Sequence, residues 1–417
     1  MARRPYRVLF LHQNFPAQFR HVAQALDRRP DVEVLAITRE GNAQPRIVRT
    51  LAYPHRPDPI LFEHPVAEHF AKRTARGLAV ARFLASLKAS GYEPDIVVGH
   101  GGWGETLFVR DVWPKVRLIL HAEFYYAAEG SDVDFDPEFA PALDGDPLVR
   151  ARVRARNAAM TQALVDADLG IAPTAFQAST FPPSLREKIL IAHEGIDTAL
   201  VSPRPDATLT LTIPAAGRTL TLGPGDEVVT FVNRTLEPYR GYHVFMRALP
   251  EILARRPQAR AVIVGDAAGG YGPAPPKGST WKDVFLREVG SRLDLARVHF
   301  VGRLTYEAYL AVLRIAALHV YATYPFVLSW SMLEAMSAGA LVLASETAPV
   351  REVLRHRENG LVFPFFAPDV LAERAIAALA DRADSDRLRT AGRQSIIETF
   401  DLVSICNPRL ERIILDR

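Results

Sequence analysis

The residues best suited to bind a ligand lie in a stretch where a predicted strand leads through a loop into a helix. An apolar, β-rich run at 318–322 precedes the loop, and apolar residues recur at helical spacing over 333–338. The loop at 326–330 therefore ends at a helix N-terminus, where unpaired N–H groups and the positive end of the helix dipole favour anions. Ser329 and Ser331 are capping candidates. This stretch predicts a phosphate site.

Three charged residues extend this chemistry. Glu334 is predicted one turn inside the helix, where its carboxylate can accept hydrogen bonds from two adjacent hydroxyls, such as those of a ribose. Arg234 and Arg240 follow a predicted strand at 228–232, and their guanidinium groups are suited to phosphate oxygens. Together these residue types indicate a site for a nucleoside diphosphate.

The same residues resemble the signature of the GT4 family of retaining glycosyltransferases, which have the GT-B fold of two Rossmann-like domains. Glu334 and the following AMSAG match the second half of the family motif. Eight residues earlier, where the family has a Glu that contacts the donor sugar, this chain has Phe326. Arg234 keeps the first family cation, whereas Arg240 replaces a Lys.

The resemblance implies a role for each matching position. Arg234, Arg240 and His121 would be catalytic, acting on the diphosphate and the donor sugar. The residues expected to bind the donor are Glu334, Phe326, Val327, Leu328, Ser329, Trp330, Ser331, Arg303 and Gly265. No metal and no cofactor are expected, and the nucleotide diphosphate sugar would be a substrate.

In the first domain, candidate residues follow the predicted strands at 7–12, 95–100 and 117–121, because ligands bind at the carboxyl ends of parallel strands. The loop after the first strand lacks the family's glycines, but its HQNFP form resembles one subgroup of the family. The residues expected on the acceptor side are Asn14, Phe15, His100, Gly102 and Glu123.

The implied reaction moves a glycosyl group, a hexosyl or N-acetylhexosaminyl group, from a UDP- or GDP-sugar to an acceptor hydroxyl with retention at the anomeric carbon. The acceptor is unknown and would be a glycan, a lipid-linked sugar or a small molecule. Two alternatives stay open: a nucleotide-sugar epimerase or hydrolase, and a GT-B protein that binds a sugar nucleotide without transfer. Phe326 and the glycine-free first loop motivate the second alternative. An α/β oxidoreductase is disfavoured because no Gly-x-Gly-x-x-Gly follows the first strand.

Composition limits the other classes of function. A net charge of +3 over 417 residues gives no strong case for nucleic acid as a partner. A single cysteine excludes an intrachain disulfide, and no run of about eighteen apolar residues is present, so we expect a cytoplasmic protein. A basic helix predicted at 63–90 is compatible with contact at the inner face of a membrane, although such a helix is more often a solvated face.

The chain length predicts an α/β protein of two domains. We expect an acceptor-side Rossmann-like domain over 1–197, a nucleotide-sugar-binding one over 198–395, and a C-terminal helix over 396–417 that packs back on the first domain. We predict that an acidic, Pro-rich segment at 129–146 is an acceptor-side or structural loop. It is not predicted to bind calcium, because it lacks the Gly and terminal Glu of an EF-hand loop. A hairpin is expected over 208–222.

Overall fold

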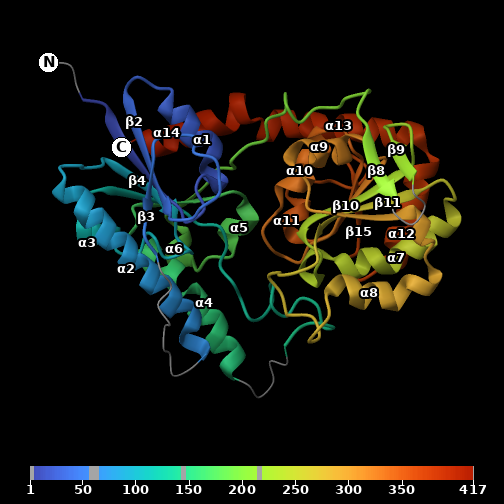
Figure 1. Cartoon of the computed structure of the whole chain (residues 1–417), viewed down its shortest axis with the longest axis horizontal. Coiled ribbons are helices and arrows are strands. Elements are labelled where there is room, and N and C mark those ends of the chain that lie inside the picture. Colours follow the sequence, from blue (N-terminus) through green and yellow to red (C-terminus); the bar gives the residue numbers. More distant parts are fainter. Residues whose placement is uncertain (1–3, 56–64, 142–146, 214–217, 417) are drawn as a thin grey trace. The chain divides into compact units, whose positions relative to one another are not determined.

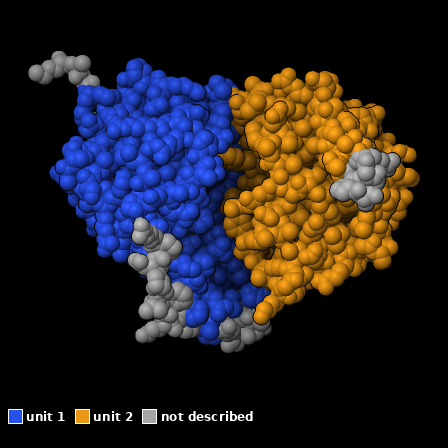
Figure 2. All heavy atoms as spheres, in the orientation of Figure 1, with its two compact units in different colours: residues 1–134, 140–195, 402–417 blue, residues 135–139, 196–401 orange. Residues whose placement is uncertain are grey.

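The protein folds into two compact units, which Figure 2 distinguishes by colour. The computed structural model describes residues 4–55, 65–141, 147–213 and 218–416. Unit 1 comprises Met1–Asp134, Ala140–Gly195 and Leu402–Arg417, and unit 2 comprises Phe135–Phe139 and Ile196–Asp401. The predicted boundaries at 197 and 395 differ from the observed ones by two and by six residues. The sequence did not predict that 135–139 belongs to unit 2, although the residues on both sides belong to unit 1.

Unit 1 is built on a parallel sheet of seven strands in the order β3-β2-β1-β4-β5-β6-β7. Its strands are β1 (Tyr6–Leu11), β2 (Val32–Arg39), β3 (Thr50–Tyr53), β4 (Ile96–His100), β5 (Arg117–His121), β6 (Leu169–Ala172) and β7 (Ile189–Ile191). Three of them, β1, β4 and β5, lie where the sequence predicted strands at 7–12, 95–100 and 117–121.

Helices cover both faces of this sheet (Figure 1). Along β1, Val8 and Phe10 point to one face and Leu9 and Leu11 to the other, because side chains alternate along a strand. The helices of unit 1 are α1 (Arg20–Asp27), α2 (Glu68–Ala89), α3 (Val109–Val112), α4 (Pro147–Asp166), α5 (Ala175–Ser179), α6 (Pro183–Arg186) and α14 (Asn407–Leu415).

The chain ends inside unit 1. Helix α14 lies beside α1 (Figure 1), and its Leu410 and Ile414 join the apolar cluster that also contains Val22 and Leu26 of α1. Arg117, at the start of β5, donates hydrogen bonds to the carbonyl oxygens of Ile413 and Ile414 at 3.0 and 2.6 Å. A buried apolar stripe and a capped C-terminus therefore hold the last helix on the first unit.

Unit 2 has a parallel sheet of six strands in the order β12-β11-β10-β13-β14-β15. Its strands are β10 (Val228–Thr235), β11 (Arg260–Asp266), β12 (Val298–Gly302), β13 (Leu318–Tyr321), β14 (Val342–Ser345) and β15 (Leu361–Phe363). Its helices are α7 (Tyr242–Arg255), α8 (Trp281–Val289), α9 (Tyr306–Arg314), α10 (Trp330–Ser337), α11 (Ala348–Arg351), α12 (Pro368–Ala380) and α13 (Arg382–Phe400). The expected hairpin is present as the antiparallel pair β8 (Leu209–Ile213) and β9 (Arg218–Leu222), and its predicted turn lies outside the described residues.

Both sheets reverse their strand order at one place. In unit 1 the first strand, β1, lies between β2 and β4, and in unit 2 β10 lies between β11 and β13. In open α/β sheets, ligands bind outside the carboxyl ends of the strands at such a reversal. The loops after β1, β4, β10 and β13 are therefore the places to look for a site.

A short piece of the acidic segment belongs to unit 2. The ring of Phe135 packs on Phe365 and Phe366, and Asp136 is buried, with its carboxylate 3.0 Å from Nε2 of His243 and 2.8 Å from the hydroxyl of Tyr324. This piece, 135–139, therefore packs within unit 2. Asp144 and Asp146 of the same predicted loop lie outside the described residues. In the described ranges, no helix is long and apolar enough to cross a membrane.

Candidate functional site

The loop between β13 and α10 ends in the predicted helix N-terminus. Ser329 is the N-cap of α10, since its Oγ accepts a hydrogen bond from the N–H of Ser331 at 3.3 Å. The N–H of Ser329 donates to the hydroxyl of Tyr321 at 2.9 Å, whereas the N–H groups of Val327 and Leu328 have no partner in the described chain. Two unpaired amides beside a helix N-terminus are suited to a phosphate. At the other end, Gly339 closes α10 at a φ of 85°.

Arg240 holds this loop from behind. Its guanidinium donates hydrogen bonds to the carbonyl oxygen of Val327 at 2.9 Å and to Oγ1 of Thr323 at 3.3 Å. The same group lies 5.1 Å from the ring centre of Phe326 and forms no ion pair with a described carboxylate. Arg240 is thus a buried cation whose charge is not neutralised by an acid, and it positions the loop as well.

Arg234 differs from Arg240 in every respect except charge. It lies near the end of β10 and is exposed, and within the described residues its side chain makes no hydrogen bond or ion pair. The cation expected to meet a diphosphate from the solvent side is Arg234, and the one that shapes the loop is Arg240.

Glu334 is buried on α10, with 8% of its surface exposed. The hydroxyl of Tyr306 donates to one carboxylate oxygen at 2.8 Å and that of Tyr309 to the other. Burial raises the pKa of the Glu334 carboxyl, and the two hydroxyls oppose this rise. The carboxylate therefore holds two hydroxyl groups, and both come from α9 of the same chain; its contact with a ribose stays a prediction.

Phe326 is buried rather than displayed on the loop. Its ring is 1% exposed and packs on the rings of Tyr239 and Tyr271 at centroid distances of 5.4 and 5.1 Å. The ring therefore supports the loop from within and is not available to a ligand. Trp330 and Ser331 both lie in the first turn of α10, Trp330 half-buried and Ser331 buried, whereas the side chain of Leu328 belongs to the apolar core.

The sequence analysis did not single out Glu237, a buried carboxylate beside this cluster. One oxygen accepts from Oγ1 of Thr235 at 2.7 Å, and the other accepts from the N–H groups of Tyr271 and Gly272 at 2.7 and 3.1 Å. A Cβ on Gly270 would lie 2.4 Å from that oxygen, so the glycine-rich segment approaches Glu237 closely. This acid fixes the segment that carries Tyr271 over Phe326.

The last two predicted donor residues lie after β11 and β12. Arg303 is exposed, and its Nε lies 3.0 Å from Oδ2 of Asp266. Gly265 has a φ of 156°, and a Cβ there would lie 2.9 Å from the carbonyl oxygen of Asn233. Gly265 therefore lets the ends of β10 and β11 approach, while the charge of Arg303 is already paired.

In unit 1, three buried histidines at strand ends share one hydrogen-bond pattern. Nδ1 of His12, His100 and His193 accepts from the N–H two residues later, at 3.0, 3.0 and 2.9 Å respectively. A nitrogen that accepts from an amide carries no proton, so the proton of each neutral ring is on Nε2. Each ring thus offers an Nε2–H donor. The expected loop residues take part, because Asn14 and Gly102 supply two of these amides, whereas Phe15 packs in the core against Phe10.

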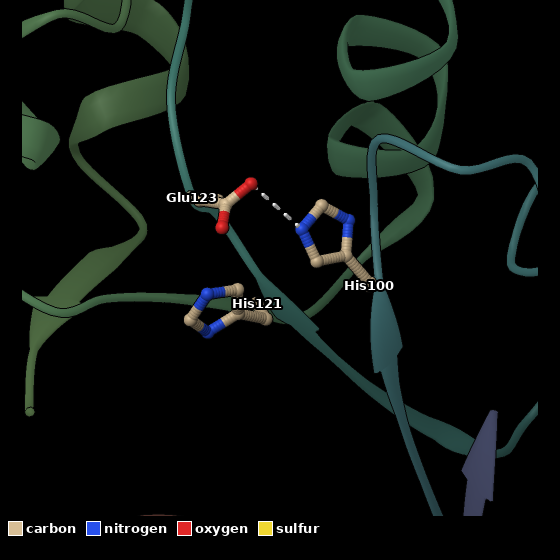
Figure 3. A group of neighbouring side chains, drawn as sticks. All are labelled: His100, His121 and Glu123. Carbon is tan, nitrogen blue, oxygen red and sulfur yellow. Dashed lines mark hydrogen bonds and ion pairs between the residues drawn. The ribbon is translucent and has the colours of Figure 1, made fainter. Parts of the chain in front are cut away.

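His121 joins this network at the end of β5. Figure 3 shows its ring beside His100 and Glu123, and His100 Nε2 lies 3.4 Å from a carboxylate oxygen of Glu123. His121 Nε2 lies 3.7 Å from Glu194. Burial, followed by the charge of His100, lowers the pKa of His121 to about 3, and the same two causes lower the pKa of His12 to about 3. These rings are neutral near pH 7.

The group His100, His121 and Glu123 has ligand atoms within 4.8 Å of one another, a spacing that a metal ion can bridge. The protonation of these side chains does not fit a metal ion. Nδ1 of His100 accepts from Gly102, so Nε2 holds the proton and donates to Glu123, whereas a metal needs an unprotonated nitrogen. The group is built as a hydrogen-bond network, and metal independence stays a prediction.

Two family models match the chain. "Glycosyl transferase family 4 group" matches residues 30–201, and "Glycosyl transferases group 1" matches residues 218–395. The chain belongs to the GT4-type glycosyltransferases.

Solved structures agree on the architecture of this chain. Anabaena HepE in complex with UDP and glucose matches with a TM-score of 0.65 at 17% identity, covering 98% of this chain and 99% of that one. Sucrose-phosphate synthase from Thermosynechococcus elongatus matches with a TM-score of 0.68 at 18% identity, covering 99% and 98%. At these identities the likeness concerns the fold, and the GT-B fold expected from the sequence is confirmed.

Curated relatives match over shorter regions. Phosphatidyl-myo-inositol mannosyltransferase of Mycobacterium tuberculosis is 30% identical over 175 residues, 41% of this chain and 42% of the relative. D-inositol 3-phosphate glycosyltransferase of Segniliparus rotundus is 26% identical over 211 residues, 50% and 42%. The chain thus spans less than half the length of these two relatives.

Several site residues escaped the sequence analysis. His12 was part of the HQNFP motif alone, and His193, Glu194, Tyr306 and Tyr309 were not among the predicted residues. A signal for the histidines was present, since each follows a strand and is followed two residues later by Asn or Gly, as in HQN, HGG and HEG. No local pattern links Tyr306 and Tyr309 to Glu334, because that contact depends on how α9 packs on α10.

Proposed function

We propose that this protein is a retaining glycosyltransferase that moves a hexosyl or N-acetylhexosaminyl group from a UDP- or GDP-sugar to an acceptor hydroxyl. The observation that carries the proposal is the loop before α10, where two unpaired amides, a helix N-terminus and the buried Arg240 meet. A nucleoside diphosphate has the charge and size for such a set. The UDP complexes of HepE, a protein of the same fold, support this donor class.

In the proposed reaction the bond between the anomeric carbon and the leaving diphosphate oxygen breaks. The acceptor oxygen attacks the anomeric carbon on the same face, and its proton passes to the departing phosphate oxygen. Arg234 and Arg240 supply positive charge where negative charge develops, which is the way fixed charges lower a barrier. No protein nucleophile is needed, and this is consistent with an apolar Phe326 in the place of the family's first Glu.

Glu334 and His121 have supporting roles in this proposal. Glu334 accepts hydroxyl hydrogen bonds in the structure, and we propose that a ribose takes the place of the tyrosine hydroxyls when the nucleotide binds. The neutral ring of His121 is proposed to make a hydrogen bond to the donor sugar or its phosphate. No metal, nucleic acid or cofactor has a part in the reaction, which we place in the cytoplasm.

A thermal-shift screen without added metal tests the donor class, since a ligand selective for the native state raises the melting temperature. We expect stabilisation by UDP or GDP and their sugars, lost in Glu334→Ala and in Arg234→Ala. Incubation with a stabilising donor and a panel of sugar, polyol and lipid-linked acceptors then tests transfer, and the anomeric coupling constant of the product tests retention. A protein that no nucleotide stabilises would contradict the proposal.

One observation favours a second candidate, a sugar-nucleotide-binding protein without transfer. The carboxylate that the family uses on the donor sugar is replaced by a buried ring. This candidate predicts a nucleotide-dependent thermal shift with no product from any acceptor and no hydrolysis of the donor. The transfer assay separates the two candidates.

A further inference from the structure

The segment 135–139 of unit 2, which we call the strap, places a buried carboxylate against the loop before α10. Oδ2 of Asp136 accepts a hydrogen bond from the hydroxyl of Tyr324 at 2.8 Å. Asp136 is 3% exposed and Tyr324 is 2% exposed, so water does not compete for this bond. Tyr324 lies in the loop that follows β13, 188 positions after Asp136, and the contact therefore forms only in the folded protein.

Asp136 has two further hydrogen-bond donors. Nε2 of His243, on α7, lies 3.0 Å from the same Oδ2, and the N–H of Glu138 donates to Oδ1 at 3.0 Å. Because a carboxylate oxygen only accepts, Nε2 of His243 carries the proton that faces it. Oδ2 of Asp136 thus connects α7 to the loop before α10. Removing either donor would leave a buried charge with less compensation.

Tyr324 connects this carboxylate to the part of the loop that offers unpaired amides. Its N–H donates to the carbonyl oxygen of Tyr239 at 3.0 Å, and the centres of the two rings lie 4.6 Å apart. The ring of Tyr239 in turn packs on that of Phe326 at 5.4 Å. Phe326 directly precedes Val327, whose N–H has no partner in the described chain. A shift of Tyr324 would therefore reach this amide, because closely packed rings transmit displacements.

The strap has other anchors on unit 2, which do not involve Asp136. The ring of Phe139 lies 5.3 Å from that of Trp281, at the start of α8. Both carboxylate oxygens of Glu138 accept hydrogen bonds from the guanidinium of Arg247, on α7, at 2.7 Å. The hydrogen bond between Asp136 and Tyr324 can therefore be removed without removing these anchors, so its role can be tested separately.

We propose that Asp136 is a positioning residue for donor binding: by holding the hydroxyl of Tyr324, it fixes the loop before α10 in the conformation whose amides bind a diphosphate. A short segment that the sequence analysis assigned to the acceptor-side domain thereby contributes to the donor site. This inference rests on the proposed function, because it takes that loop as the diphosphate site. A carboxylate that served only the stability of unit 2 would affect unfolding and leave nucleotide affinity unchanged.

Calorimetric titration of UDP and GDP into the full-length protein tests the role of the hydroxyl. Tyr324→Phe removes the hydroxyl and keeps the packed ring. We expect the affinity for the nucleotide that the wild type prefers to fall about tenfold, as is usual when a hydrogen bond to a charged group is lost. The matched control is Tyr242→Phe, because the hydroxyl of Tyr242 is buried in unit 2 and has no hydrogen-bond partner in the described chain. This control is expected to bind nucleotide like the wild type.

Variants of the strap complete the test. Asp136→Ala is expected to weaken nucleotide binding at least as much as Tyr324→Phe, and adding Tyr324→Phe to it should cost no further affinity, because both changes remove the same hydrogen bond. Asp136→Asn keeps an oxygen that can accept from the hydroxyl, so it should bind nearly as well as the wild type. If Asp136→Ala fails to fold, Asp136→Asn should lose affinity only when combined with Tyr324→Phe. Glu138→Ala, which removes the other acid of the strap, should keep wild-type affinity.

The transfer assay gives a readout that a general loss of stability would not change. Tyr324→Phe is expected to raise KM for the donor and to leave KM for the acceptor unchanged. Urea denaturation of the same samples measures stability independently, so an effect on affinity can be compared with an effect on unfolding.

Two results would overturn the inference alone. One is nucleotide affinity in Tyr324→Phe equal to that of the wild type, with or without a lower urea midpoint. The other is an equal loss of affinity in Tyr242→Phe, since that hydroxyl has no contact with Asp136. A wild-type protein that binds neither UDP nor GDP would instead contradict the proposed function, and the inference with it.

Discussion

The carboxyl ends of the two parallel sheets use different chemistry although their strand orders reverse in the same way. In unit 1 the edge is a network of buried histidines, with His12, His100 and His121 in a row across β1, β4 and β5. In unit 2 the corresponding edge carries backbone amides, a buried cation at Arg240 and aromatic rings packed around Phe326. The shared topology determines where a ligand binds, and the side chains determine which groups can be recognised.

The two edges differ in the hydrogen-bonding groups that they offer to a ligand. Neutral rings with Nε2–H donors suit neutral oxygens such as sugar hydroxyls, while an uncompensated guanidinium with free amides suits phosphate. The specificity of each edge depends on buried polar groups. Removing one such group from an edge therefore tests that edge.

Acid is expected to have the largest effect, and mainly on the edge of unit 1. Burial lowers the pKa of His12 and His121 to about 3 and that of His193 to about 4, whereas an unfolded histidine titrates near pH 6.5. Between pH 6.5 and 4 the unfolded chain binds more protons, so the free energy of unfolding falls as pH falls, by about 1.4 kcal/mol per pH unit for each such histidine. Urea denaturation at pH 7, 6 and 5 measures this slope.

His193→Asn is the matched variant for the acid experiment. The amide oxygen of Asn can still accept the hydrogen bond from Gly195, but the side chain does not titrate. We expect a smaller pH slope in this variant. His319 in unit 2, whose pKa burial lowers to about 3, contributes a slope of the same sign that the variant leaves unchanged. An identical slope in the two proteins would show that His193 is not one of its sources.

Asp136→Ala tests the support of the aromatic edge in unit 2. The carboxylate is buried and bonded to His243 and Tyr324, and although burial raises its pKa, those two partners bring the pKa below its ordinary value. Removing one partner of a buried pair costs about 3 kcal/mol, so the urea midpoint at pH 7 should fall markedly. The exposed Glu138, two residues away, is the control: Glu138→Ala is expected to cost less than about 1 kcal/mol. Equal losses would mean that the segment, not the buried pair, matters.

Arg240→Ala is expected to lower kcat/KM of donor-dependent transfer by about 100-fold, because a fixed charge that stabilises the transition state is lost. The loop carbonyl of Val327 also loses its donor. Arg255→Ala removes an exposed arginine from α7, where Arg255 pairs with Glu373, and should leave turnover unchanged. Wild-type turnover in Arg240→Ala would end the assignment of this cation to the reaction.

The smallest expected effect concerns Glu334 and the ribose. The wild-type protein should bind UDP or GDP about tenfold more tightly than the 2′,3′-dideoxy nucleotide, a difference typical of hydrogen bonds to a charged group. Glu334→Gln should lose most of this discrimination, whereas Glu307→Gln, an exposed acid on α9, should keep it. If Glu334→Gln still discriminates, the carboxylate serves only Tyr306 and Tyr309.

Local sequence was sufficient for much of the fold. Apolar runs such as those of β4 and β5 mark buried parallel strands, and Ser329 and Gly339 mark the two ends of α10, because periodicity and capping are properties of neighbouring residues. The family signature around Arg234 and Glu334 depends on the same short-range spacing, and the family models confirm the membership that it indicated.

Only the tertiary structure decided what each charged side chain does. Sequence places Arg234 and Arg240 six residues apart as two equivalent cations, yet one is exposed and the other is buried behind the loop. The sequence shows Phe326 in the place of the family's Glu, but it does not show that the ring is buried under Tyr271. It also does not connect Tyr309 to Glu334. Spacing along the chain determines elements and their ends, whereas burial and partners arise from contacts between segments far apart in sequence, which no local pattern encodes.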